Sequence, residues 1–426
     1  MVHSNNSTPV AVIGSGVAGL TAAYLLQRRY AVTLYEASER LGGHAHTHDV
    51  ALRAGASTPV DTGFIVHNRA TYPNLVRLFD ELGVETRPTE MSMSIRCFGC
   101  GLEYAGGRGL SGVFGEPRQT LRPRFLRMLA EVRRFHRAAR SVLAGSDDSR
   151  TLRAFLDALG FSTYFVDHFV APLVSTVWST GTQDALTYPA AYLFRFLDNH
   201  GMLSVSGSHQ WRTVAGGSRT YVERAAKRLS AVRTGCPIRS VQRHADGADV
   251  RADAGETHTF AHVVIATHAD QALAMLTDPS PAERDTLGAF RFTTNDVVLH
   301  RDTRLLPRSA RTRASWNYVA NTCGSPGATG ARVTYDMSRL QHLGEGTHEP
   351  LLVSLGQSDR VRHDRVLKRF SYTHPVYTPE SVAAQEKLPA LADGRVQFAG
   401  AWQGWGFHED GCVSGIRAAR ALGVTW

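Results

Sequence analysis

The feature that most constrains the fold of this sequence is a glycine-rich turn close to the N-terminus. The turn reads G-S-G-V-A-G over residues 14–19. It follows the apolar run PVAVIG and opens a segment with helical spacing, after which AVTLYE, residues 31–36, has the composition of a second strand. Because G-x-G-x-x-G between a strand and a helix is typical of dinucleotide sites, the sequence predicts a Rossmann-type unit here.

Each glycine of this turn would have its own physical purpose. Gly14 permits the tight turn, Gly16 lets the backbone approach a pyrophosphate, and Gly19 lets the helix pack closely on the strand. The helix would present unpaired N–H groups and the positive end of its dipole to the phosphates. Glu36, at the end of the second strand, is placed to accept hydrogen bonds from an adenosine ribose. The alternative is a glycine-rich turn in an unrelated α/β unit.

The segments that follow resemble those of the two-dinucleotide-fold flavoproteins. Arg40, Gly42 and Gly43 come after Glu36 in the order E-x3-R-x-G-G, and PVDTGFIVHN, residues 59–68, resembles the next segment of that superfamily. The resemblance implies that the second glycine pair lets the chain run close beside the cofactor and that the arginine helps to neutralise phosphate. It also implies that the backbone of the second segment turns past a flavin ring. It therefore favours FAD over NAD.

The C-terminal segment also resembles a cofactor motif. RVQFAG, residues 395–400, has the pattern of a final strand, and residues 411–422 have that of a final helix. This arrangement resembles the closing FAD motif of the amine oxidase and phytoene desaturase superfamily. There the helix N-terminus points at the N1/C2=O edge of the flavin, where its dipole stabilises negative charge. We expect Asp410 at the N-cap of the helix, with Glu409 and His408 beside the ring.

A middle segment resembles the strand that returns to the nucleotide domain in these flavoproteins. This segment is FAHVVIATHADQAL, residues 260–273, and by the same resemblance Ile238 and Val241 lie near the adenine. The residues expected to bind the cofactor are Gly14, Gly16, Val17, Ala18, Gly19, Glu36, Ala37, Arg40, Gly42, Gly43, His44, Thr62, Gly63, Phe64, Ile238, Thr267, Gly400, His408, Asp410, Gly411 and Ser414.

Stretches along nearly the whole chain are similar to one bacterial family, that of predicted NAD/FAD-binding, amine-oxidase-like proteins. They include E-A-x-x-R-L-G-G-H-x-H-T, VDTGFIVHN, WRTVAGGSRTYVE, ATHADQAL and GFHEDGxxSG. Members are often encoded beside cyclopropane-fatty-acid-synthase-like methyltransferases, which implies a fatty-acyl or phospholipid substrate.

The resemblance implies an α/β protein in which a two-dinucleotide-binding, Rossmann-type FAD domain carries an inserted mixed α+β substrate domain. We expect the FAD domain to comprise residues 1–70, 205–275 and 385–426, and the substrate domain to comprise residues 71–204 and 276–384. No second nucleotide motif stands between a clear strand and helix, so no NAD(P)H domain is expected. Electrons would leave the flavin to oxygen, a quinone or another protein, or return to the substrate.

The leading interpretation is dehydrogenation (desaturation) of a hydrophobic substrate, with hydride transfer to flavin N5 while a base takes the adjacent proton. His408 is the first candidate for this base, because an imidazole titrates near neutrality, and Glu409 is the second. The alternatives are a hydrogen bonder in the cofactor loop for His408 and a buried partner of an arginine for Glu409. Amine oxidation and a redox-neutral double-bond isomerisation also stay open.

Many amine oxidases use a lysine that holds water near flavin N5, and this sequence offers few candidates. It has only three lysines, Lys227, Lys368 and Lys387, and none lies in a recognisable motif. An apolar pocket could draw on the aromatic side chains of residues 151–200, although most of them should form core. They are Phe161, Tyr164, Phe165, Phe169, Trp178, Tyr192, Phe194 and Phe196.

The charge and hydropathy patterns limit the kinds of binding partner that we expect for this protein. The net charge is +9, but no nucleic-acid motif accompanies it, so we expect no nucleic acid partner. Residues 118–140 have the pattern of a basic amphipathic helix, typical of a membrane-surface helix or of an ordinary helix with solvated arginines. With no apolar run near the roughly 20 residues of a membrane span and no secretory pattern, we expect a cytoplasmic protein with a small hydrophobic substrate. Peripheral contact with the inner membrane surface stays open, and the sequence carries no indication of the oligomeric state.

Cysteine and histidine spacings were the remaining candidates for a metal site. Cys97 and Cys100 form a lone C-x-x-C, but structural zinc takes four ligands, usually from two such pairs. His44, His46 and His48 would share one face of a strand, yet they directly follow the glycine pair, where a cofactor should lie. The sequence therefore predicts free thiols and no metal site.

Overall fold

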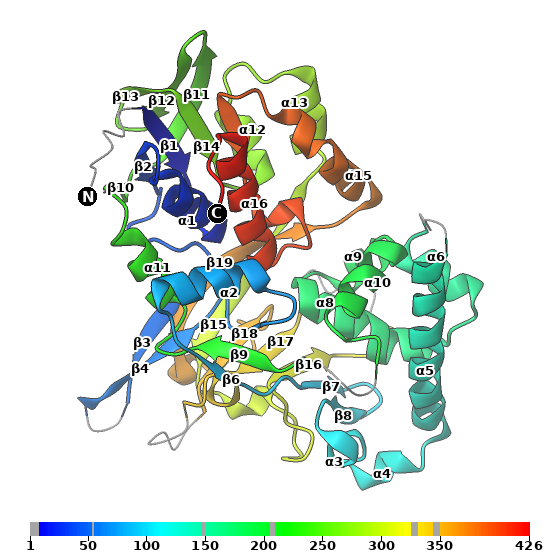
Figure 1. Ribbon diagram of the computed structural model, residues 1–426. Helices are drawn as coiled ribbons and strands as arrows, with labels where there is room; N and C mark the ends of the chain where they lie inside the picture. The colour runs from blue at the N-terminus through cyan, green and yellow to red at the C-terminus, as the bar shows by residue number, and fades with distance from the viewer. Residues whose placement is uncertain (1–7, 53–54, 146–149, 205–208, 325–330, 344–349) are drawn as a thin grey trace.

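The structure is a computed structural model that describes residues 8–52, 55–145, 150–204, 209–324, 331–343 and 350–426. Figure 1 shows three regions: a parallel sheet with its helices, a large central sheet, and a helical lobe that contains α5, α6, α8, α9 and α10. None of the helices in the described ranges is both long and apolar enough to cross a membrane.

Five of the described strands form a parallel sheet in the order β10-β2-β1-β14-β20. Val12 of the central strand lies opposite Leu34 on one side and Val264 on the other. These strands are nearly continuous apolar runs because helices or strands cover both faces of the sheet. Their bounds are β1 (Pro9–Ile13), β2 (Ala31–Tyr35), β10 (Ala231–Arg233), β14 (His262–Ile265) and β20 (Val396–Phe398).

Helices from distant parts of the chain cover one face of this sheet and share one hydrophobic core with it. α1 and α16 lie side by side although they come from opposite ends of the chain (Figure 1). A Cβ atom added to Gly415 of α16 would lie 2.4 Å from the carbonyl oxygen of Ala18 of α1, so this crossing requires glycine. The helices are α1 (Val17–Leu26), α2 (Pro73–Leu82), α11 (Arg219–Ala226) and α16 (His408–Ala421).

A second core on the other face joins the parallel sheet to a small antiparallel sheet and further helices. The sheet has the order β11-β12-β13, and its bounds are β11 (Ile238–His244), β12 (Gly247–Ala252) and β13 (Thr257–Phe260). The helices are α12 (Ala269–Met275), α13 (Pro281–Leu287) and α15 (Pro379–Lys387).

The large central sheet has the order β19-β15-β18-β17-β16-β7-β8 within the described ranges. Its neighbours are antiparallel except β16 and β7, which run parallel. The bounds are β7 (Met93–Cys97), β8 (Glu103–Gly106), β15 (Arg291–His300), β16 (Trp316–Ala320), β17 (Val333–Asp336), β18 (Leu352–Leu355) and β19 (Val366–Val376). Two smaller sheets are formed by β3 (Thr47–Ala51) with β4 (Ser57–Asp61), and by β5 (His67–Asn68), β9 (Trp211–Val214) and β6 (Thr86–Pro88).

The helical lobe packs its aromatic side chains into a core of its own, which continues to β7, β8 and β16. It consists of α3 (Gly109–Val113), α4 (Pro117–Thr120), α5 (Pro123–Ala144), α6 (Leu152–Ala158), α7 (Thr163–Phe165), the π-helical turn η2 (Val166–Val170), α8 (Ala171–Trp178), α9 (Thr182–Thr187) and α10 (Ala190–Asn199). The short α14 (Met337–Leu340) follows β17, and the 3-10 turns are η3 (Thr303–Leu305), η4 (His363–Arg365), η5 (Leu388–Leu391) and η6 (Ala401–Gln403).

The structure corrects several expected boundaries. The predicted helix 118–140 is divided, because Pro123 holds the preceding residue Arg122 extended and starts α5 afresh. α2 and α13 pack in the two cores around the parallel sheet, although both lie in the ranges expected for the substrate domain. α2 packs against α11 and α16, and α13 packs against α12 and α15, which a division by sequence position does not reveal.

The structure also gives Glu409, the second candidate base, a different partner from the one expected. α2 begins without a side-chain cap of its own. The Glu409 carboxylate of α16 accepts hydrogen bonds from the backbone N–H groups of Asn74 (3.1 Å) and Leu75 (2.9 Å) and from the Asn74 side-chain amide (2.7 Å). A carboxylate at a helix N-terminus satisfies unpaired N–H groups and complements the dipole. Glu409 thus links α16 to α2, and both of its oxygens are occupied.

Replacing Glu409 by alanine should therefore lower stability rather than remove a proton acceptor. We expect Glu409→Ala to reduce the free energy of unfolding by about 1–2 kcal/mol, the usual cost of losing a helix cap. Denaturant unfolding would measure this change. Glu386→Ala is the control, because it removes an exposed carboxylate from α15. Unchanged stability together with a large loss of turnover would contradict the capping role.

Candidate functional site

A cavity of about 890 Å³ opens at the carboxyl ends of the parallel strands. Its lining includes Ile13 at the end of β1, Tyr35 at the end of β2 and Ala266 just after β14. β1 lies between β2 and β14, so the chain leaves the sheet in opposite directions on the two sides of this point. In open α/β sheets, ligands bind in the crevice at such a switch point.

The glycine-rich turn forms one end of the cavity with the geometry that its spacing predicted. Gly14 has a φ of +100°, and a Cβ atom there would lie 2.7 Å from the carbonyl oxygen of Ala266. At Gly19 it would lie 1.8 Å from the carbonyl oxygen of Gly14, which explains the close packing of helix on strand. At Gly16 it would meet no atom within 4 Å, so this position faces open space. The turn and the start of α1, with Val17 and Ala18, are therefore free to receive a phosphate group.

Glu36 lines the same end of the cavity, as predicted. One carboxylate oxygen accepts hydrogen bonds from the backbone N–H of Ser15 (3.0 Å) and from its hydroxyl group, and the other accepts from the Ser38 N–H (2.9 Å). These bonds fix the carboxylate beside the glycine turn. Ala37, Ile238 and Thr267 line the cavity near it.

The two glycines of the second pair, Gly42 and Gly43, have different roles, and Arg40 does not face the cavity as expected. Gly43 lines the cavity, whereas a Cβ atom on Gly42 would lie 3.0 Å from a Val222 methyl group, so Gly42 is a packing position. Arg40 does not line the cavity; its guanidinium donates to the carbonyl oxygens of Gly43 (2.7 Å) and Leu41. Arg40 thus holds the turn from outside the cavity, and its contact with phosphate stays a prediction.

The segment after β4 places one predicted residue in the cavity wall and another behind it. The Thr62 hydroxyl group is buried against the Tyr372 hydroxyl group (2.7 Å) and does not line the cavity. Gly63 and Phe64 do line it, and a Cβ atom on Gly63 would lie 2.2 Å from the carbonyl oxygen of His44. The backbone therefore passes the cavity closely at Gly63, as the resemblance implied.

The N-terminus of α16 reaches the opposite side of the cavity, where Gly400, Phe407 and His408 line it. The helix begins at His408, so the predicted N-cap position of Asp410 is wrong. Asp410 lies one turn inside the helix, and its carboxylate accepts a hydrogen bond from the Phe407 N–H (2.9 Å). Burial raises the pKa of Asp410 to about 7.

The next predicted residues of α16 support the cavity from behind instead of lining it. A Cβ atom on Gly411 would lie 2.5 Å from a Val17 methyl group, so Gly411 allows α16 to meet α1. The Ser414 hydroxyl group accepts a hydrogen bond from the Gly400 N–H (2.9 Å) and donates to the Gly411 carbonyl oxygen. Both residues position the helix terminus without touching the cavity.

His408 is half-buried in the cavity wall, and its ring stacks on Phe64 with centroids 3.7 Å apart. Burial, and then the neighbouring His44 and His67, hold the pKa of His408 well below its usual range. The expectation that this imidazole titrates near neutrality is therefore wrong. A neutral imidazole can donate or accept a hydrogen bond at a cofactor, but it is a weak base.

Four polar atoms in the cavity wall have no hydrogen-bond partner among the described residues. They are His44 Nε2, Thr176 Oγ1, Trp316 Nε1 and His408 Nε2, and all four are buried. Buried polar groups are normally paired. A ligand with hydrogen-bonding groups along its length, such as an isoalloxazine ring with its substrate, fits a wall of this kind. The residues present thus fit FAD, with phosphates at the glycine turn and the ring near α16.

The sequence motifs identified only part of the cavity wall at the end near α16. Of the eight aromatic residues singled out between 151 and 200, only Trp178 and Phe196 line it, and the other six pack in the lobe core. Residues that these motifs missed come from α8 and from the central sheet: Thr176, Val177, Ser179, Trp316, Tyr335 and His374. No local motif marks them, because distant segments bring them together.

The three alternating histidines take different partners and do not converge on one point. His44 lines the cavity, whereas His46 accepts or donates a hydrogen bond at the Tyr372 hydroxyl group (2.9 Å) and its ring lies against that of His48 (3.9 Å between centroids). Burial lowers the pKa of His44 and of His48 to about 4. His44 is thus a neutral wall residue, as its predicted cofactor contact requires.

Comparison with known proteins agrees with this geometry. A family described as "Flavin containing amine oxidoreductase" matches residues 17–368, well over half of the chain. The chain is 28% identical over 295 residues to the "Putative flavin-containing monoamine oxidase AofH" of Mycobacterium tuberculosis. This match covers 65% of the chain and 61% of that relative, so it spans less than two thirds of the relative's length.

Solved structures show the same fold. A cofactor-redesign mutant of putrescine oxidase superposes with a TM-score of 0.70 at 14% identity, covering 97% of this chain and 98% of the other. A fatty acid isomerase of P. acnes that produces CLA also superposes with a TM-score of 0.70, at 15% identity, covering 98% and 99%. At such identities the likeness concerns the fold alone. The family match shows that the chain belongs to the flavin-containing amine oxidoreductase family, and the residues of the cavity fit the cofactor that this family name implies.

Proposed function

We propose that the chain dehydrogenates a neutral, hydrophobic substrate, most simply a fatty-acyl chain or a lipid. The observation that carries this proposal is the distribution of charge along the cavity. The charged side chains in the described lining are Glu36, Arg239 and Asp253, and all of them lie at the nucleotide end, near β2 and β11.

The remainder of the wall is apolar or uncharged. It includes Met91, Val177, Trp178, Phe196, Met202, Trp211, Trp316, Tyr335 and Phe407. A protonated amine moved into such a wall would lose its hydration without gaining a carboxylate partner, which is strongly unfavourable. A hydrocarbon chain would instead gain about 25 cal/mol for each Å² of apolar surface buried.

When bound, FAD supplies the hydride acceptor of the reaction. The contribution of this chain is to bind and orient the substrate in a dry cavity. Thr176 Oγ1 and Trp316 Nε1 are the unpaired donors on the side formed by the lobe and the central sheet, and they suit an acyl carbonyl or carboxyl oxygen. None of the three lysines lines the described wall, so a lysine-held water has no counterpart here.

Two alternatives have their own support. The monoamine oxidase relative and the putrescine oxidase neighbour favour amine oxidation, which in this cavity would require the amine to bind in its neutral form. The fatty acid isomerase neighbour favours a redox-neutral shift of a double bond. The absence of charged side chains in the described wall at the substrate end suits double-bond isomerisation as much as it suits desaturation.

An anaerobic assay separates these three reactions. We expect the yellow holoenzyme to bleach when mixed with a fatty acid or phospholipid and to remain oxidised with a panel of mono- and diamines. Mass spectrometry should then show a lipid that has lost two hydrogen atoms. Bleaching by amines alone would overturn the proposal in favour of amine oxidation. A lipid of unchanged mass with a displaced double bond would replace desaturation with isomerisation.

His408 should act as a hydrogen-bonding group for the cofactor and not as the base. We expect His408→Ala to weaken FAD binding about tenfold, equal to about 1.4 kcal/mol, because one buried hydrogen bond is lost. His408→Asn should restore part of this affinity. The measurement is FAD affinity by fluorescence, together with the rate of flavin reduction by substrate.

The matched control is His67→Asn, since His67 is also buried beside Phe64 but lies outside the cavity wall. It should leave FAD affinity near that of the wild type. A fall of about 100-fold or more in the reduction rate of His408→Asn, with normal FAD affinity, would instead make His408 the base.

Peripheral contact with an anionic membrane is proposed for the outer end of the helical lobe. The apolar side of α5, with Phe125, Met128 and Phe135, is buried in the lobe, so this helix cannot place that side in a bilayer. Near its N-terminus, however, Leu110 and Leu121 are 76% and 85% exposed. The exposed arginines Arg118, Arg124 and Arg127 accompany them. Exposed leucines among arginines are typical of a surface that meets anionic lipid.

Co-sedimentation with vesicles tests this contact. Vesicles that contain anionic phospholipid should bind the holoenzyme, and added salt should weaken binding because it screens the arginines. The double variant Leu110→Ser/Leu121→Ser should bind several-fold less. Leu367→Ser, which changes an exposed leucine of β19, is the control. Equal binding by the double variant and the wild type, or no binding at low salt, would exclude this surface.

A further inference from the structure

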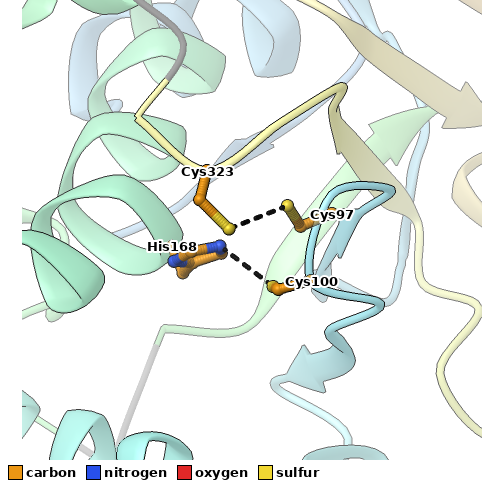
Figure 2. Close-up of side chains that lie close together, drawn as sticks. All are labelled: Cys97, Cys100, His168 and Cys323. Atoms are coloured by element: carbon orange, nitrogen blue, oxygen red, sulfur yellow. Dashed lines mark hydrogen bonds between the residues drawn. The ribbon is translucent and has the colours of Figure 1, made fainter.

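Four ligand-type side chains converge at a point outside the cofactor cavity. They are Cys97, Cys100, His168 and Cys323, and their sulfur and nitrogen atoms all lie within 4.8 Å of one another. Figure 2 shows them facing a common centre, with Cys97 Sγ 3.8 Å from Cys323 Sγ and Cys100 Sγ 3.4 Å from His168 Nε2. None of the four lines the cavity, and all three cysteines are free thiols.

The backbone explains how the distant cysteines meet. Cys97 ends β7 and Cys323 follows β16, and these neighbouring strands run parallel with Cys97 opposite Ala320. The turn between Cys97 and Cys100 packs tightly on the second strand end. A Cβ atom on Gly99 would lie 2.9 Å from the Cα atom of Thr322, so glycine is required there. The C-x-x-C turn is therefore held against Cys323.

The histidine is oriented for metal binding. His168 lies in the π-helical turn η2, and its Nδ1 donates a hydrogen bond to the Tyr164 carbonyl oxygen (2.9 Å). That bond places the proton on Nδ1 and leaves the lone pair of Nε2 directed at the cysteines. Histidines that bind metals almost always donate their other ring N–H in this way. Cys97 and His168 are each only 1% exposed, whereas Cys100 is half-buried and Cys323 is exposed.

The distances suit one tetrahedral ion. With Zn–S bonds of about 2.3 Å and Zn–N bonds of about 2.0–2.1 Å, tetrahedral geometry separates two sulfurs by about 3.8 Å and a sulfur from a nitrogen by about 3.6 Å. The observed 3.8 Å and 3.4 Å agree with these separations. Three thiolates and one imidazole are a common set for structural zinc, whereas magnesium and calcium prefer oxygen ligands.

We propose that Cys97, Cys100, His168 and Cys323 bind one zinc ion in a closed, structural Cys3His site. The expectation of no metal site rested on the absence of a second C-x-x-C pair, and the proposal departs from it because two single ligands lie beside the first pair. The third and fourth ligands come singly, from a helix and from the end of another strand. No spacing rule based on paired cysteines could reveal them.

The ion would join the helical lobe to the central sheet. η2 continues directly into α8, whose last turns carry Thr176 and Trp178 of the cavity wall. Fixing His168 to the ends of β7 and β16 therefore fixes the start of the helix that forms this wall. Zinc would act on substrate binding only through position, since all four of its coordination sites are filled by protein.

Metal analysis of the full-length holoenzyme tests the site without any activity assay. Protein produced with added zinc and purified anaerobically, without chelator, should contain about one zinc per chain by elemental mass spectrometry. Cys323→Ser and His168→Gln should each retain less than about half of that amount. Cys236→Ser, which changes a cysteine outside the cluster, should retain all of it.

Two further measurements distinguish the loss of zinc binding from misfolding of the variants. A strong chelator should lower the Tm of the wild type and leave that of Cys323→Ser nearly unchanged, because metal binding stabilises only a protein that binds it. Cobalt given to the metal-free wild type should produce the long-wavelength bands of tetrahedral thiolate coordination, beyond the absorption of oxidised flavin.

Several outcomes would overturn the proposal. These are zinc below about 0.2 equivalents after zinc is added to the metal-free protein, zinc content unchanged in both ligand variants, or iron in place of zinc. A disulfide between Cys97 and Cys323 in the anaerobically purified protein would overturn it too, because a disulfide removes two of the ligands. Since the readouts are metal content, Tm and cobalt absorption, the result is independent of which substrate the enzyme oxidises.

Discussion

The contact between two helices from opposite ends of the chain is the constraint on which the site depends. α1 and α16 approach so closely that a side chain at Gly411 or Gly415 would collide with Val17 or Ala18. Each helix begins at the cavity, so the crossing fixes the distance between the two helix N-termini. One of them would meet the phosphates of FAD and the other would meet its ring. The same crossing carries Glu409 to the start of α2, which extends the support to a third helix.

The buried histidines give the cavity a particular electrostatic character. Burial lowers the pKa of His44 to about 4 and that of His374 to about 3, and it also holds the pKa of His408 well below the usual range. Three imidazoles are therefore present without adding positive charge at neutral pH. They can bind the heteroatoms of a flavin and yet leave the substrate end apolar.

Sequence reasoning succeeded where the function is encoded locally. The glycine turn, its flanking strands and Glu36 lie within one short segment, and their structure agrees with the spacing because close contacts require glycine at positions 14 and 19. The FAD cofactor and the family followed from such segments. The return strand β14 and the final strand β20 were also found, since both are short apolar runs.

The failures have one common cause, which is that tertiary contacts decide the role of a residue. Arg40 donates a hydrogen bond to the Gly43 carbonyl oxygen instead of facing the cavity. Asp410 lies inside α16 because the helix begins at His408, earlier than predicted. Thr176 and Trp316 reach the cavity from α8 and β16, which no single motif connects. Cys323 and His168 join the C-x-x-C turn only because strands β7 and β16 pair in parallel and the lobe folds against them.

The order of synthesis gives the crossing of α1 and α16 a consequence for assembly of the holoenzyme. The glycine turn is synthesised long before the wall residues Phe407 and His408, which follow it by nearly 400 residues. A nascent polypeptide can thus fold its first strands and display a phosphate site early. The wall that would enclose an isoalloxazine is complete only when α16 has docked against α1.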